Sequence, residues 1–150
     1  MTTPHFALSS RSLDVYCAAR YEPVHEWFRV TWRGFVVNED GVRGATAYLQ
    51  LLGALPCAML LNDNSGVTGP WFDSLDWLER IWAPQAIALG LRYVAHVLPA
   101  HDFPSVLPPA DAFAGQFELQ IFTTVAEAEQ WLSSCRAALH STLSSGFQPQ

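Results

Sequence analysis

Polar side chains that could bind a small molecule follow an apolar run near the middle of the chain. Residues 57–61 are all apolar, and the next five residues form a polar segment: Asn62, Asp63, Asn64, Ser65 and Gly66. In open α/β sheets, ligands bind at the carboxyl ends of the strands, where this segment is expected to lie. Trp71 and Trp77 could add an apolar wall to such a site. The same residue types also form tight turns that only satisfy their own backbone, and this second interpretation is the more common one.

A second group of side chains could hold a metal or transfer a proton. His96 lies in an apolar run, and His101 and Asp102 follow it in the next segment. Metal sites normally show more closely spaced ligands, so a core histidine with satisfied hydrogen bonds is the simpler interpretation of His96. The cysteines do not form a ligand pair either, because they are far apart: Cys17, Cys57 and Cys135.

The motifs of the common enzyme classes do not occur in the sequence. It contains no G-x-S-x-G nucleophile turn, no G-x-G-x-x-G and no phosphate-binding G-x-x-x-x-G-K-[ST]. We therefore expect a protein without catalytic residues, without a cofactor and without a metal.

The composition fits one packed domain. The chain has 150 residues, of which 50% are hydrophobic and six are Trp, and its formal net charge is −6. An acidic chain with dispersed charges does not suit nucleic acid or an anionic membrane surface. We see no basic, apolar leader and no apolar run long enough to span a bilayer, and three separate cysteines suit a reducing compartment. These features favour the cytoplasm and predict no membrane span.

The elements that must position these residues begin with a hairpin. Apolar and polar residues alternate over residues 13–19 and again over residues 28–33, which predicts two antiparallel strands ending at Gly34. Asn38 is expected as the N-cap of a helix that Gly53 ends. One face of this helix is apolar: Val42, Ala45, Leu49 and Leu52.

Strands and helices then alternate along the chain. In order we expect a strand at 57–61, a polar loop at 62–70, a helix at 75–82, a strand at 91–98, a loop at 99–115, a strand at 118–122 and a helix reaching residue 139. Pro84 should kink the middle helix or open a second short helix ending at Gly90. Thr124 and Glu127 have the spacing of a capping box.

This order predicts an α/β fold with a mixed, mainly parallel sheet of four or five strands, an antiparallel N-terminal hairpin and packed helices. The runs at 57–61 and 91–98 are expected as inner strands because they are apolar throughout. Residues 1–12 are interpreted as an N-terminal extension, 13–140 as the domain and 141–150 as a flexible tail.

The order of several short motifs resembles that of the bacterial SpoIIAA-like proteins, also called STAS/SEC14-like. The motifs are Trp32-Arg33-Gly34-Phe35, Leu60-Leu61-Asn62-Asp63-Asn64, Trp77-Leu78-x-x-x-Trp82-x-Pro84, Gly90-Leu91-Arg92-Tyr93-Val94-Ala95 and Glu127-Ala128-Glu129-Gln130-Trp131-Leu132. The resemblance implies a non-catalytic α/β module that regulates through contact with another protein. The SEC14 part of the name suggests an alternative, a pocket near Trp71 and Trp77 for a small apolar or lipid-like ligand, and an uncharacterised enzyme is the third possibility.

The resemblance also draws attention to Asp73 and Ser74. Anti-sigma-factor antagonists of the wider family carry a phosphorylated Ser at a helix start in an Asp-Ser-Ser/Ala-Gly context, and Asp73-Ser74 matches this in part. Leu75-Asp76 replaces the rest, and the neighbouring carboxylates would repel a phosphate. A simple N-cap is the preferred interpretation of Asp73 or Ser74.

Six Trp are too many to be buried completely, since the side chain is large. We expect some to line a pocket or a contact surface, where aromatic residues are common. A homodimer that uses residues 74–82 or 85–89 is the expected assembly. The alternative is a monomer in which the loop at 99–115 covers these residues.

Overall fold

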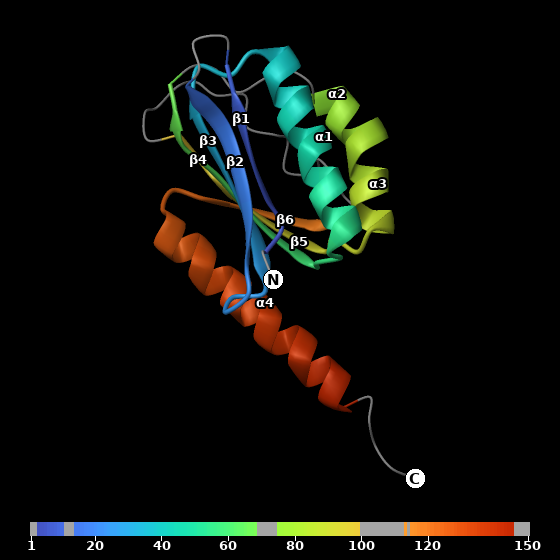
Figure 1. Cartoon of the computed structure of the whole chain (residues 1–150). Coiled ribbons are helices and arrows are strands. Elements are labelled where there is room, and N and C mark those ends of the chain that lie inside the picture. Colours follow the sequence, from blue (N-terminus) through green and yellow to red (C-terminus); the bar gives the residue numbers. More distant parts are fainter. Residues whose placement is uncertain (1–2, 11–13, 69–74, 100–112, 114, 146–150) are drawn as a thin grey trace.

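The sheet of this protein is covered by helices on both faces. The computed structural model describes residues 3–10, 14–68, 75–99, 113 and 115–145. Helices α1, α2 and α3 cover one face of the sheet and α4 covers the other (Figure 1). In chain order the elements are β1 (His5–Ser9), β2 (Val15–Glu22), β3 (Trp27–Gly34), α1 (Asn38–Ala54), β4 (Met59–Val67), α2 (Leu75–Trp77), the π-helix η1 (Leu78–Trp82), α3 (Ala83–Ala88), β5 (Tyr93–Val97), β6 (Glu118–Phe122) and α4 (Val125–Ser145).

The six strands lie in the sheet in the same order as in the chain. The pairs β1–β2 and β2–β3 are antiparallel, and the three remaining pairs are parallel. The mixed, mainly parallel sheet with an N-terminal hairpin is therefore confirmed, and β4 and β5 are inner strands as expected. The expected number of strands was wrong, because β1 forms inside the segment interpreted as an N-terminal extension and adds an edge strand.

The hairpin has the predicted alternation except at the start of β2. Cys17 and Ala19 face the core opposite Trp32 and Val30, as the pattern predicts. Tyr16, expected on the solvent side, is instead buried, while Val15 is exposed. The pairing with β1 shifts between Leu8 and Ser9, so two residues of β2 oppose one of β1. Such a bulge bends the strand and changes which side chains face the core.

Helix α1 packs very close to the sheet. A methyl group at Gly44 would overlap the ring of Trp32 and lie 3.0 Å from Sγ of Cys17, so only glycine fits here. Asn38 is the first residue of the helix rather than its cap, which corrects the prediction; Val37 occupies the cap position without a side-chain hydrogen bond.

The helical segment between β4 and β5 changes its hydrogen-bond pattern at η1. The N–H of Ala83 bonds the carbonyl of Leu78, five residues earlier. In this register the carbonyl of Glu79 would need the N–H that Pro84 lacks, and it accepts from Nε2 of Gln116 at 3.4 Å instead. Pro84 therefore explains why this segment departs from α-helical hydrogen bonding. The short helix α3 that follows is one of the two outcomes predicted for Pro84.

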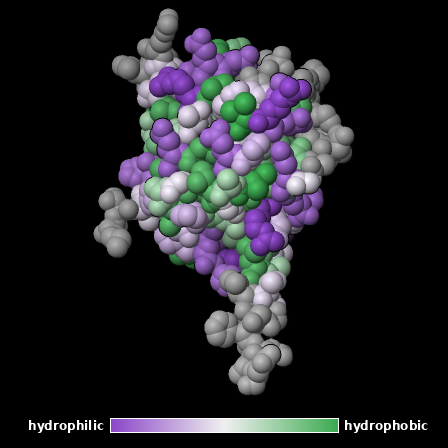
Figure 2. All heavy atoms as spheres, turned by 90° about the vertical axis from the view of Figure 1, so that its right-hand side faces the viewer, coloured by the Kyte–Doolittle hydropathy of each residue, from purple (hydrophilic) through white to green (hydrophobic). Residues whose placement is uncertain are grey.

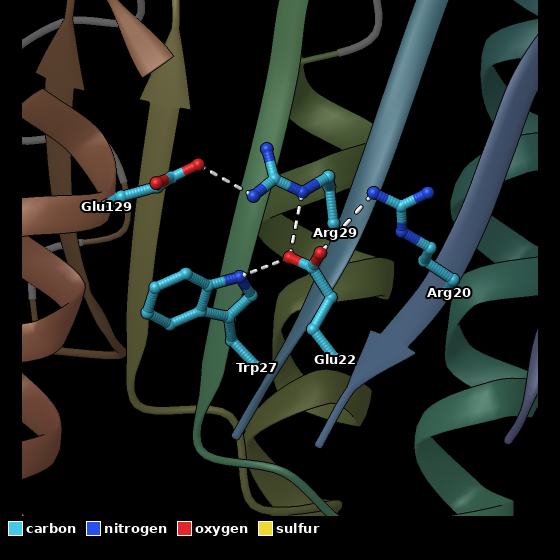
Figure 3. A network of polar contacts seen from close by, with 5 residues as sticks. All are labelled: Arg20, Glu22, Trp27, Arg29 and Glu129. Carbon is cyan, nitrogen blue, oxygen red and sulfur yellow. Dashed lines mark hydrogen bonds and ion pairs between the residues drawn. The ribbon is translucent and has the colours of Figure 1, made fainter. Parts of the chain in front are cut away.

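Helix α4 is joined to the other face of the sheet by a second apolar core and by a polar network. The core contains Trp27, Leu61, Ala95, Val97, Ala128 and Leu132. The N–H of Glu127 bonds Oγ1 of Thr124 at 3.2 Å, which confirms the predicted cap. Above this core, Arg29 donates to Glu22 and to Glu129, each at 2.8 Å, and Nε1 of Trp27 donates to Glu22 at 2.8 Å (Figure 3).

Within the part of the chain that the structure describes, none of the helices has the length and apolar character needed to cross a membrane.

Candidate ligand-binding site

A cavity of about 80 Å³ lies between the sheet and the helices α1 and η1. Its sheet side consists mainly of apolar residues from β3 to β6: Val30, Leu60, Val94 and Leu119. Its helix side is formed by Ala45, Tyr48, Leu78 and Trp82, and Phe113 and Phe117 also line it. The cavity is thus inside the larger apolar core and mostly apolar.

Besides Tyr48 of α1, whose hydroxyl has no hydrogen-bond partner among the described residues, polar side chains from two inner strands line this space. Asn62 and Asn64 belong to β4, and His96 belongs to β5. The sequence interpretation of residues 62–70 as a loop is wrong for residues 62–67, because β4 continues through Val67. Asn is rare in strands, but here each amide finds partners on neighbouring strands, and such contacts override intrinsic propensity.

A bulge in β4 lies beside this polar group. Thr31 pairs with Asp63, whereas Arg33 pairs with Gly66, so β4 has one extra residue opposite Trp32. Bulges are over-represented next to functional sites because they redirect side chains. Asn64, at the bulge, is only 1% exposed.

The hydrogen bonds determine the positions of Oδ1 and Nδ2 in the side-chain amides of Asn62 and Asn64. The indole Nε1 of Trp32 can only donate, and it lies 2.8 Å from Oδ1 of Asn62. Nδ2 of Asn62 therefore faces Nδ1 of His96, at 3.2 Å, and donates to it. Nδ2 of Asn64 donates to the backbone carbonyl of Asn62 at 3.3 Å and also lies 3.2 Å from Nδ1 of His96.

His96 is neutral in this setting. Because Nδ1 accepts a hydrogen bond, the ring carries its proton on Nε2. Burial lowers the pKa of His96 from 6.5 to about 4. His96 thus fits the prediction of a core histidine with satisfied hydrogen bonds. Near neutral pH it is not an imidazolium, so it has no acidic proton to transfer.

The predicted site residues separate into three groups. Asn62 and Asn64 line the cavity, whereas Asp63 and Ser65 do not; Oδ1 of Asp63 accepts from the N–H of Ser65 at 2.9 Å. Trp77 packs partly buried against the core without lining the cavity. The remaining candidates lie outside the described residues: Trp71, Asp73, Ser74, His101 and Asp102.

Neither metal-type clusters nor reactive thiols occur in the described ranges. No three His, Cys, Asp or Glu side chains gather there in a way that could hold a metal ion. The three cysteines are buried and free. Burial raises the pKa of Cys17 to about 12, and burial together with the nearby Glu118 raises that of Cys135 to about 11. Thiols with such pKa values are protonated and poorly reactive.

Sequence reasoning missed the helix side of the cavity. Tyr48 and Trp82 enclose it, and their rings lie 5.9 Å apart. The signal that could have found it is the pair Gly44 and Ala45, two small residues on the sheet-facing side of a helix opposite Trp32. Small residues next to large aromatic rings leave space that a regular apolar face would fill.

Comparison of the chain with protein-family models, with curated proteins and with solved structures gives no match. The function of the chain is therefore inferred from the geometry of the cavity.

Proposed function

We propose that this chain is a non-catalytic module, of the SpoIIAA-like kind that its motifs resemble, and that it binds a small ligand in the cavity between the sheet and helices α1 and η1. One observation carries the proposal: the buried amide of Asn64, the partly buried amide of Asn62 and a neutral imidazole line a space that is otherwise mostly apolar. Ligand sites usually combine apolar walls with a few placed polar groups in this way.

Burial of these polar groups is unfavourable unless they have a use. Moving an amide out of water costs about 1–3 kcal/mol when its hydrogen bonds are not all replaced. A core needs only apolar residues at such positions to be stable. Asn62 and His96 have hydrogen-bond partners in this core, but no described residue donates to Oδ1 of Asn64, and this acceptor supports recognition of a ligand.

The test is binding in solution with a variant whose cavity is filled. Ala45 lines the cavity from α1 and is 7% exposed, so Ala45→Leu places a larger side chain into the space. We expect small neutral organic molecules to raise the melting temperature of the wild type in a saturable way, as any ligand of the native state does. They should leave Ala45→Leu unchanged.

Ala47→Leu is the matched control, because Ala47 is on the same helix but does not line the cavity. It should bind like the wild type. Equal responses of the wild type and Ala45→Leu would contradict the proposal.

We also propose, as a second candidate function, contact with another protein, with a homodimer as the simplest case. Two exposed apolar residues support it: Phe35 is 64% and Val37 46% exposed, just beyond β3. On the face that carries α2 and α3, hydrophobic side chains lie between hydrophilic ones (Figure 2). Exposed apolar side chains that lie close together often mark contact surfaces.

A further inference from the structure

We propose that the ligand of the cavity is a compact, uncharged molecule with an apolar body and one hydrogen-bond donor, such as a short branched alcohol, whose donor bonds Oδ1 of Asn64. This inference rests on the proposed function and specifies its ligand.

The absence of charge in the ligand follows from the wall of the cavity. Among the described residues that line it, none is Asp, Glu, Lys or Arg. Two titratable side chains in the wall, His96 and Tyr48, are both neutral, because burial lowers the pKa of His96 to about 4 and raises that of Tyr48. An ion without a partner of opposite charge would lose its hydration with no replacement, so the site discriminates against anions and cations alike.

The need for a donor follows from the orientation of Asn64. Its Nδ2 donates to the carbonyl of Asn62, which can only accept, so Oδ1 points away from that carbonyl. Among the described residues, none donates a hydrogen bond to Oδ1 of Asn64. Asn64 is 1% exposed and lines the cavity, so in this proposal a hydroxyl or N–H group of a ligand bound there donates to Oδ1.

The positions of the polar and apolar residues along β4 and β5 indicate where the apolar part of the ligand lies. Leu60 and Val94 lie on the same face as Asn62 and His96, two residues earlier in their strands. The polar end of the cavity is thus nearer the carboxyl ends of β4 and β5, and the apolar floor lies about 7 Å further down. A ligand binds with its donor at Asn64 and its hydrocarbon part toward Leu60 and Val94.

The size of the cavity limits the ligand. An engineered protein cavity of about 150 Å³ holds benzene. The space here is about 80 Å³, so a molecule of about five non-hydrogen atoms is the appropriate probe.

Four probes of nearly equal size separate these features: isobutanol, isobutyronitrile, isobutyrate and isobutylammonium. The first is neutral with a donor, the second is neutral without a donor, and the last two are ions. Titration of ¹⁵N-labelled protein, followed by the side-chain amide signals of Asn62 and Asn64, gives an affinity for each probe. We expect isobutanol to bind about three- to tenfold more tightly than the nitrile, the factor expected for one hydrogen bond. Both ions should bind more weakly than the nitrile.

Asn64→Val removes the acceptor with a smaller increase in volume than leucine would bring. On this variant isobutanol and the nitrile should bind with equal affinity. If this variant does not fold, the ranking of the four probes on the wild type still decides. An ion that binds as tightly as isobutanol, or a nitrile that equals it, would overturn the inference while leaving the proposed function intact. Failure of all four probes and of larger neutral molecules to bind would instead remove the proposed function.

Discussion

His96 is the residue whose protonation depends most on the fold. Its pKa is lowered to about 4 in the native state, against 6.5 for an ordinary histidine. Between these two values the unfolded chain binds a proton that the native state does not. The native state is therefore stabilised above pH 6.5 relative to lower pH, and this part of the stability is lost as the pH falls from 6.5 toward 4.

We expect His96 to account for about 2 kcal/mol of the loss of unfolding free energy between pH 7.5 and pH 5. Urea denaturation of the wild type and of His96→Gln at both pH values measures it. The variant should lose about 2 kcal/mol less than the wild type over this interval. The same pH dependence in both proteins would show that His96 titrates normally in the native state.

Tyr48 is a second residue whose environment gives a prediction. Its side chain is 2% exposed, and its hydroxyl has no hydrogen-bond partner among the described residues. Tyr48→Phe removes the unsatisfied group and keeps the ring that faces Phe28 and Trp82. We expect an unfolding free energy that is equal or higher by up to about 1 kcal/mol. A loss of more than that in a denaturation experiment would indicate that the hydroxyl bonds a water or a ligand.

Among the elements, α1 depends on the absence of a side chain at Gly44. Gly44→Ala would force the ring of Trp32 or the helix itself to move, and Trp32 also holds Asn62 in place. We expect a loss of about 2 kcal/mol and weaker binding in the cavity. Gly53→Ala is the control on the same helix, because its nearest neighbour would be 4.0 Å away. It should be neutral or stabilising by about 0.5 kcal/mol in the same denaturation assay.

The attachment of α4 depends on Arg29, which joins Glu22 of β2 to Glu129 of α4 (Figure 3). Burial opposes ionisation of Glu22, but hydrogen bonds from Arg29 and Trp27 outweigh it, and the pKa of Glu22 is lowered. The stability that the Glu22 carboxylate contributes is therefore fully present above pH 4.5, its ordinary pKa, and is lost as the pH falls through its lower native pKa. This pH range lies below the one in which His96 affects stability.

Arg29→Ala leaves Glu22 largely buried without its main partner, and we expect a loss of about 2 kcal/mol in unfolding free energy at pH 7. Amide exchange in α4 should increase more than in α1. Arg20→Ala removes another arginine from the same carboxylate, but Arg20 is 64% exposed, so its loss should change stability by less than about 0.5 kcal/mol. Similar effects of the two variants would contradict this view of the network.

Elements were predicted correctly where the residues follow a single hydrophobic pattern or where a cap is formed by a residue a few positions away. The alternation in β3, the apolar runs of β4 and β5 and the Thr124 cap are local patterns, and they appear as expected. The polar part of β4 could not be predicted, because Asn62 and Asn64 are stabilised by Trp32 and His96, which are distant in the chain. The small residues Gly44 and Ala45 are visible in the sequence, but that the rings of Trp32 and Trp82 pack around them depends on segments distant in the chain.

For the whole molecule, the sequence predicted a homodimer through residues 74–82 or 85–89, and this remains untested; Ile81 is exposed there. Because Phe35 and Val37 are both exposed just beyond β3, we expect these two residues to form the contact instead. Light scattering over a dilution series should give about twice the mass of one 16.6 kDa chain. The double variant Phe35→Ser, Val37→Ser should shift the mass toward the monomer. Val24→Ser is the control, because Val24 is 82% exposed but lies in the turn at the opposite end of β3. A mass near 16.6 kDa for the wild type at every concentration would reject the dimer.

The chain-ordered sheet has a consequence for how the protein reaches its native state. Every strand pairs with the strand that precedes it. The antiparallel pairs of β2 and β3 join residues 5 to 15 positions apart, whereas the parallel pairs join residues 25 to 34 positions apart. Contacts of short sequence separation form faster, because less chain entropy is lost before they form. During synthesis the strands also leave the ribosome in chain order. The hairpin of β2 and β3 can therefore form first on the ribosome, each parallel strand can add as it emerges, and the docking of α4 completes the second core last.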